Sequence, residues 1–162
     1  MRIAKIYILF SHLHEGTDYS ILCSTTDAEE ILKECKEFGL TERLEDENDI
    51  KLTVETIERL NNIDFGFSDG VRYVLNTHEI GIPEDRVMYG VFLNGNDYCW
   101  KAEMIDLFPT KEKAIENVIE NLSRKNYDPY EMEEYRNSLR NMDTLTDWDF
   151  NYWDIIKIKN IE

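Results

Sequence analysis

The chain carries the same local pattern twice, about 80 residues apart. In Ala102–Leu122 the side chains alternate as in an extended strand as far as Phe108, and Pro109, which has no N–H to donate, ends the strand. Apolar residues at helical spacing then follow, namely Ala114, Ile115, Val118, Ile119 and Leu122. Asp18–Phe38 repeats this plan. Two copies of strand, stop and helix restrict the chain to a mixed fold of sheet and helix.

Both predicted helices have end signals. Thr110 is a plausible N-cap because its hydroxyl can accept a hydrogen bond from the first turn. Thr26 followed by Glu29 has the spacing of a capping box, and Gly39 provides a C-terminal stop. These signals predict helices over Thr26–Phe38 and Thr110–Arg124.

A further strand precedes each copy. Ile3–His12 and Val87–Leu93 are each followed by a polar, glycine-containing turn, and Asn94-Gly95 is a strong hairpin signal. The second strands of the two hairpins are Asp18–Ser24 and the segment that ends at Phe108. Both faces of Ile3–His12 are mostly apolar, which predicts a central strand covered on both sides.

The rest of the chain completes each half. Apolar spacing and turn residues predict helices at Thr53–Asn61 and from Asp128-Pro129 onward, and strands at Val71–Ile80 and Asn151–Ile161. Three segments are interpreted as connections: Leu40–Asp49 as a solvated loop or the fraying end of a helix, Ile63–Gly70 as turn-rich, and Asn141–Asp149 as acidic.

The predicted fold class is α+β, with tandem ββαβ-like units and a mostly antiparallel sheet with helices on one face. The first ββα(α)β unit is expected at 1–82 and the second at 83–162, with the boundary in Gly81–Asp85. The two units could join into one sheet of about six strands, or sit as two lobes.

The two repeats, KIYILFSHLHEGTDYSILCSTTDAEEIL and VFLNGNDYCWKAEMIDLFPTKEKAI, resemble a diffuse group of small bacterial and phage proteins. These proteins combine a hairpin, a T-x-E-x-A helix start and a closing strand rich in Tyr, Trp and acids. Thr110–Ala114 fits that start, and Thr25–Ala28 fits one residue short. The resemblance implies a bacterial or phage origin and a small α+β module, and it carries no activity.

Composition narrows the cellular setting. Hydrophobic residues make up 42% of the 162 residues, and no apolar run approaches the roughly 18 residues that span a membrane. The first ten residues alternate too regularly for a signal peptide. Three cysteines at unrelated spacings fit neither a disulfide framework nor a zinc cluster, so a cytoplasmic location is expected.

Charge is the most unusual property of the chain. It has 34 acidic and 18 basic residues, for a formal net charge of -16. The first 84 residues contain 18 acids and 8 bases, and the last 78 contain 16 and 10, so both halves carry the excess. Such a protein repels nucleic acid and anionic membranes and attracts basic partners. The alternative is that the acidity serves solubility alone.

Catalytic and cofactor signals are weak. His12 and His14, with Glu15 and His78, could bind a divalent metal, but no third ligand at helical i, i+4 spacing accompanies them. Cys23 stands just before a helix N-terminus, where a thiolate is favoured, whereas Cys35 lies on a helical apolar stripe and Cys99 has no Cys–His signature. Phosphate-binding glycine motifs are absent from the sequence. No cofactor, metal or catalytic residue is therefore predicted.

Acidic residues mixed with aromatic residues are the strongest remaining signal. Aromatic side chains anchor interfaces, and carboxylates meet Arg and Lys on a partner. The predicted partner-binding residues are Glu45, Asp46, Glu47, Asp49, Tyr130, Glu131, Glu134, Asp143, Asp147, Trp148, Asp149 and Asp154. The competing interpretation is that the rings belong to the core and the acids only face water.

We interpret the chain as a non-enzymatic acidic binding protein that blocks a basic surface of a protein partner. The expected partner is a nuclease or another nucleic-acid-binding protein, with no direct nucleic acid and no membrane. A phage anti-defence inhibitor (anti-CRISPR-like) and an immunity protein are both of this class. The alternative is a small-ligand- or metal-binding protein, or an enzyme, that uses a groove between the two units.

Overall fold

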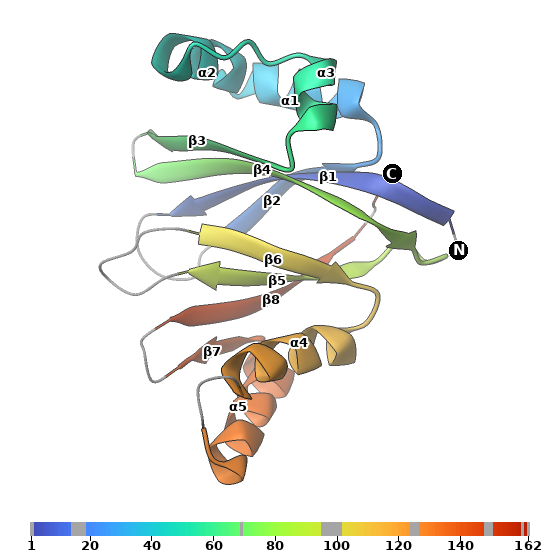
Figure 1. The fold of residues 1–162 in the computed structure, drawn as a ribbon, viewed down its shortest axis with the longest axis vertical. Helices are drawn as coiled ribbons and strands as arrows, with labels where there is room; N and C mark the ends of the chain where they lie inside the picture. Colours follow the sequence, from blue (N-terminus) through green and yellow to red (C-terminus); the bar gives the residue numbers. More distant parts are fainter. Residues whose placement is uncertain are drawn as a thin grey trace. The chain divides into compact units, whose positions relative to one another are not determined.

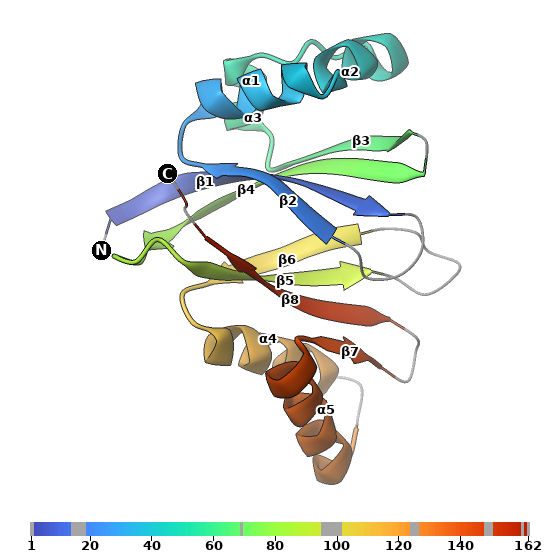
Figure 2. The ribbon, with the colours of Figure 1, turned by 180° about the vertical axis from the view of Figure 1, so that it is seen from behind.

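The computed structural model describes residues 2–13, 19–68, 70–94, 102–123, 127–147, 151–159 and 161. It forms two compact units, Met1–Ile82 with Asn160–Glu162 and Pro83–Lys159. Each unit is an antiparallel sheet whose helices pack on one face (Figures 1 and 2), so the predicted α+β class is confirmed. Among the described residues, no helix has the length and apolar character needed to cross a membrane.

The first unit contains four strands and, in its described part, three helices. They follow in the order β1 (Arg2–Leu13), β2 (Tyr19–Thr25), α1 (Ala28–Glu37), α2 (Leu40–Asn48), α3 (Val54–Arg59), β3 (Asn62–Ser68) and β4 (Val71–Ile82). The sheet order is β2-β1-β4-β3. β1 is therefore an inner strand, as its apolar faces predict, and Ile6, Ile8, Leu9 and Phe10 are fully buried.

The second unit repeats this arrangement. Its elements are β5 (Met88–Asn94), β6 (Ala102–Phe108), α4 (Lys111–Ser123), α5 (Pro129–Met142), β7 (Thr144–Thr146) and β8 (Tyr152–Ile158). The sheet order β6-β5-β8-β7 is the same as in the first unit, strand for strand. Even the irregularity of the first hairpin recurs, between Leu9 and Phe10 in β1 and between Val91 and Phe92 in β5. The repeat seen in the sequence is thus a repeat of topology.

Each unit has one strand more than the sequence patterns indicate. The strands form two four-stranded sheets, so a single sheet of about six strands is wrong. The turn-rich interpretation of Ile63–Gly70 is also wrong, because Asn62–Ser68 is the edge strand β3. Gly66, at φ 75°, lies at an irregularity in this strand, and its amide donates to the Asp64 carboxylate at 2.8 Å. Glycine and aspartate are common in turns as well as at bulges, which is why the sequence pattern indicated a turn here.

Two other connections also contain regular structure. Leu40–Asn48 is a helix of its own, α2, and is neither a loop nor the fraying end of α1. Thr144–Thr146, inside the predicted acidic connection, is the edge strand β7, which pairs with β8. A strand of three residues is too short to show alternation, so sequence periodicity could not reveal it.

Each helical layer packs on its sheet through the predicted apolar stripes. In the first unit, Ile31 and Cys35 of α1 pack with Leu9 and Leu75 of the sheet. In the second unit, the stripe of α4 packs with the sheet residues Val91, Leu145, Trp153 and Ile155, and all five of its members are buried.

The helix starts follow the predicted caps in all but one case. The Thr110 and Asp128 side chains accept hydrogen bonds from the amides of Lys113 and Glu131, as predicted. The capping box at Thr26 is wrong, because α1 begins one residue later and its N-cap is Asp27. Aspartate is preferred over threonine at the N-cap position, so the helix begins after Asp27 and not after Thr26.

Candidate functional site

The helix α2 presents carboxylates to solvent because only one side of it is apolar. Leu40 and Leu44, four residues apart, are buried against the first sheet's helical layer. Most of the other positions then face outward, and residues 45–48 are all exposed. The exposed acids of this segment, here called the α2 acidic surface, are Glu42, Glu45, Asp46, Glu47 and the C-cap residue Asp49.

Two backbone features hold the α2 acidic surface in place. Gly39 lies in the left-handed region at φ 70° and lets the chain leave α1 and start α2 directly. Asp49, at φ 53°, ends the helix with its amide donating to the Glu45 carbonyl at 3.0 Å. The carboxylates are therefore carried by a helix whose start follows a left-handed glycine and whose C-terminus is capped.

The one cation of α2 does not neutralise this surface. The side chain of Arg43 is only 14% exposed, and its guanidinium lies 3.7 Å from where a Cβ on Gly66 would sit. It makes a loose i, i+4 pair with Glu47, with Nε 3.8 Å from Oε1. Within the described part of the chain, Glu47 is the only member of the α2 acidic surface that takes part in an ion pair. The other four carboxylates point into water.

The acids of the second unit are arranged differently. Arg136 of α5 donates to both oxygens of Glu116 on α4, at 2.9 and 3.3 Å, and to Glu133 at 2.9 Å. The hydrogen bond to Glu116 is the main cause that raises the pKa of Arg136. Asp143, a predicted partner-binding residue, pairs with Lys111. These carboxylates join α4 to α5 and are partly neutralised within the unit.

The start of α5 carries three of the predicted partner-binding residues. Tyr130 is 73% exposed, Glu134 is exposed and Glu131 is half-buried. A hydrogen bond from the Tyr130 hydroxyl to Glu134, one turn later, raises the pKa of Tyr130. This end of the helix presents an aromatic ring with a carboxylate beside it.

Two other predicted site residues lie in the interior. Asp147 is 4% exposed and Asp154 is 7% exposed. The Asp147 carboxylate accepts from the Asn151 amide at 3.0 Å, from the Asn151 side chain at 3.3 Å and from the Trp153 indole at 3.0 Å. It fastens the connection between β7 and β8 from a buried position. Trp148 and Asp149 lie outside the described residues.

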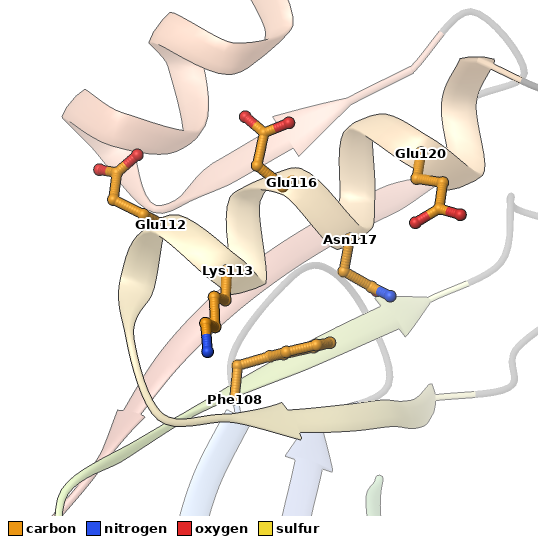
Figure 3. A pocket seen from close by; sticks show the side chains of 6 residues that line it. All are labelled: Phe108, Glu112, Lys113, Glu116, Asn117 and Glu120. Carbon is orange, nitrogen blue, oxygen red and sulfur yellow. The ribbon is translucent and has the colours of Figure 1, made fainter.

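An open groove runs between the end of β6 and one side of α4. Its volume is about 390 Å³, and its lining consists of Phe108, Glu112, Lys113, Glu116, Asn117 and Glu120. Figure 3 shows the Phe108 ring below the helix, with Lys113 and Asn117 directed toward it. The sequence interpretation missed this groove. The available signal was a glutamate at every fourth position of α4, next to an aromatic strand end.

Only some of the candidate histidine and cysteine residues lie within the described part of the chain. His12 is buried, with its ring centroid 4.6 Å from that of Tyr19, whereas His14, Glu15 and Cys99 lie outside the described residues. Burial raises the pKa of Cys35 to about 12, with smaller contributions from Cys23 and Glu34. That thiol stays protonated at neutral pH, which makes it a poor nucleophile. Over the described ranges, no three His, Cys, Asp or Glu side chains are grouped to hold a metal ion.

Comparison of the chain with protein-family models, with curated proteins and with solved structures finds no match. The functional argument therefore depends on the surfaces described above.

Proposed function

We propose that this chain is a non-enzymatic binding protein whose α2 acidic surface occupies a basic, nucleic-acid-binding surface of a protein partner. The observation that supports this proposal is the set of four carboxylates on α2 and its cap that have no neutralising partner within the described structure. A protein that needed acids only for solubility could place them beside cations, as the second unit does with the glutamates of α4 and the arginines of α5.

The charge spacing of α2 supports the choice of partner. Residues 40–49 span roughly 15 Å at 1.5 Å per residue. They carry five carboxylates and one guanidinium, which leaves four net negative charges. This is roughly one charge per 4 Å of helix axis, close to the one phosphate per 3.4 Å of axis that each strand of duplex DNA carries. A basic surface of the partner that binds one strand of DNA would therefore meet a similar density of negative charge on α2.

The net charge of -16 assists the encounter. The attraction between this negative charge and a basic partner raises the association rate. The same negative charge repels other acidic proteins and nucleic acid. A phage anti-defence (anti-CRISPR-like) inhibitor and an immunity protein against a nuclease both require these properties. Such a protein would act in the cytoplasm, where its target handles nucleic acid.

Capture from a nuclease-treated bacterial lysate tests the proposal. The immobilised proteins are the wild type, an α2 variant E45Q/D46N/D49N and a control variant E37Q/E55Q/E58Q. The control removes the same three charges from exposed positions at the end of α1 and on α3. Bound proteins are eluted with an excess of duplex DNA and identified by mass spectrometry.

We expect the wild type and the control to retain a basic nucleic-acid-binding protein that duplex DNA releases. The α2 variant should retain at least several-fold less of it, because three charge contacts are lost. Equal retention by the α2 variant and the wild type would contradict the proposal, as would a captured protein that duplex DNA does not displace.

A further inference from the structure

An exposed aromatic residue stands directly before the α2 acidic surface. Phe38 is the C-cap residue of α1 and is 42% exposed. It precedes Gly39, the left-handed residue from which α2 starts. The proposed function uses the carboxylates of α2 and gives this ring no role.

The Phe38 ring is positioned by its neighbours although much of the residue faces water. Its centroid lies 5.8 Å from that of the Tyr73 ring, with an angle of 41° between the two ring planes. Tyr73, on β4, is half-buried and packs against the hydrophobic core of the first unit. The backbone is held as well, because the Phe38 amide donates to the Glu34 carbonyl at 3.2 Å. The first unit thus presents an aromatic ring to solvent from a supported position.

The carboxylates of α2 begin close to this ring. Glu42, Glu45 and Asp46 stand at i, i+3 and i+4, so they share one face of the helix, and all three are exposed. Glu42 is four residues from Phe38, a separation that the chain can stretch to at most roughly 14 Å. A single surface of a partner can therefore contact the ring and the carboxylates together.

An aromatic ring beside carboxylates matches the chemistry of arginine. The carboxylates attract lysine and arginine alike, but the planar guanidinium stacks on an aromatic face, whereas the lysine ammonium is more strongly hydrated. The exposed Lys36, in the last turn of α1, opposes both cations equally and does not change the preference between them. Arginine is also the residue that nucleic-acid-binding proteins use most for specific contacts with guanine, besides its contacts with phosphates.

We propose that Phe38 is the aromatic anchor beside the α2 acidic surface, and that its ring receives the guanidinium of an arginine from the partner's nucleic-acid-binding surface. This inference rests on the proposed function, because the arginine belongs to the surface that α2 occupies. It adds a residue that lies outside the acidic segments, and it specifies which cation the partner supplies. Phenylalanine and arginine are both enriched at the cores of protein interfaces.

NMR titration of the isotope-labelled full chain with two peptides of equal charge tests this inference. The probes are blocked hexa-arginine and hexa-lysine peptides. The quantity measured is the ratio of their dissociation constants, in which the charge attraction common to both peptides cancels. We expect the arginine peptide to bind more tightly, with saturable shifts at Phe38 and Gly39 and along α2. Filtered NOEs should join its arginine side chains to the Phe38 ring, a measurement that needs no variant.

Variants at Phe38 separate the ring from the charges. Phe38→Leu keeps an apolar side chain and removes the π system, so the preference for arginine should fall roughly two- to fivefold. Phe38→Tyr keeps the ring and should preserve the preference. Phe108→Leu makes the same exchange at a half-buried phenylalanine of the second unit, and it should leave the preference unchanged.

The α2 variant E45Q/D46N/D49N distinguishes this inference from the proposed function. It should bind both peptides more weakly and keep the preference for arginine, because Phe38 is intact. An unchanged preference in Phe38→Leu, an equal fall in Phe108→Leu, or the absence of NOEs to the Phe38 ring would overturn the arginine contact. If the α2 variant bound both peptides like the wild type while Phe38→Leu lost the preference, the arginine contact would stand and the role of α2 would be contradicted.

Discussion

At the scale of single residues, the structure separates two kinds of carboxylate that look alike in the sequence. Asp46 is exposed on α2, whereas Asp147 is buried and holds three N–H groups. Both stand in acidic segments, so sequence composition could not distinguish them. The difference arises from the Asn151 amide and the Trp153 indole, which donate to Asp147 beside the paired strands β7 and β8.

The buried position of Asp147 predicts a stability effect. Asp147→Ala removes the acceptor for the Trp153 indole and the Asn151 amide, and it should lower the free energy of unfolding by about 2–3 kcal/mol. Asp147→Asn keeps an oxygen acceptor and should cost less. Asp46→Ala, at an exposed position, should change stability by about 0.5 kcal/mol or less. Urea denaturation measures all three, and equal stability of Asp147→Ala and Asp46→Ala would contradict this role.

At the scale of elements, the sequence predicted what depends on local pattern and missed what depends on pairing. The repeated strand–stop–helix unit, the stripe of α4 and the caps at Thr110 and Asp128 were predicted because neighbouring residues determine them. β3 was missed because Gly66 places a bulge in it, and β7 because it is only three residues long. Both are edge strands, each paired with a single neighbour, β4 or β8.

The candidate site also contains a part that the sequence predicted and a part that it did not. Glu45, Asp46, Glu47 and Asp49 were predicted to bind a partner from their acidity alone, and the structure places all four at exposed positions. The groove at Phe108 was not predicted. Its lining joins the end of a strand to one side of the following helix, and hydrophobic periodicity describes only the other, buried side of that helix.

The link between α1 and α2 depends on the backbone of Gly39. A Cβ at this position would meet no atom within 4 Å, so only its φ of 70° opposes a larger residue. Gly39→Ala should therefore lower the free energy of unfolding by about 1 kcal/mol, and Gly39→Asn by less, because asparagine tolerates this conformation. Urea denaturation measures the difference. An alanine variant as stable as the wild type would show that α2 does not need the left-handed turn.

At the scale of the whole molecule, charge is the property that most needs an explanation. Both units are acidic, but the described ion pairs within α5 and between α4 and α5 neutralise part of the second unit. The first unit leaves most of the α2 acidic surface open to water. An interaction through that surface should depend on salt, because exposed charges are screened within roughly 10 Å at 0.1 M ionic strength.

The most direct measurement is the dissociation constant for the basic protein retained in the capture experiment, determined at 50 and 200 mM salt. For the wild type and for E37Q/E55Q/E58Q, we expect the affinity to fall by roughly tenfold or more over this range. For E45Q/D46N/D49N, we expect weaker binding at 50 mM and a smaller dependence on salt. A dissociation constant that is the same at both salt concentrations for the wild type would contradict the proposal that α2 carboxylates occupy a phosphate-binding surface.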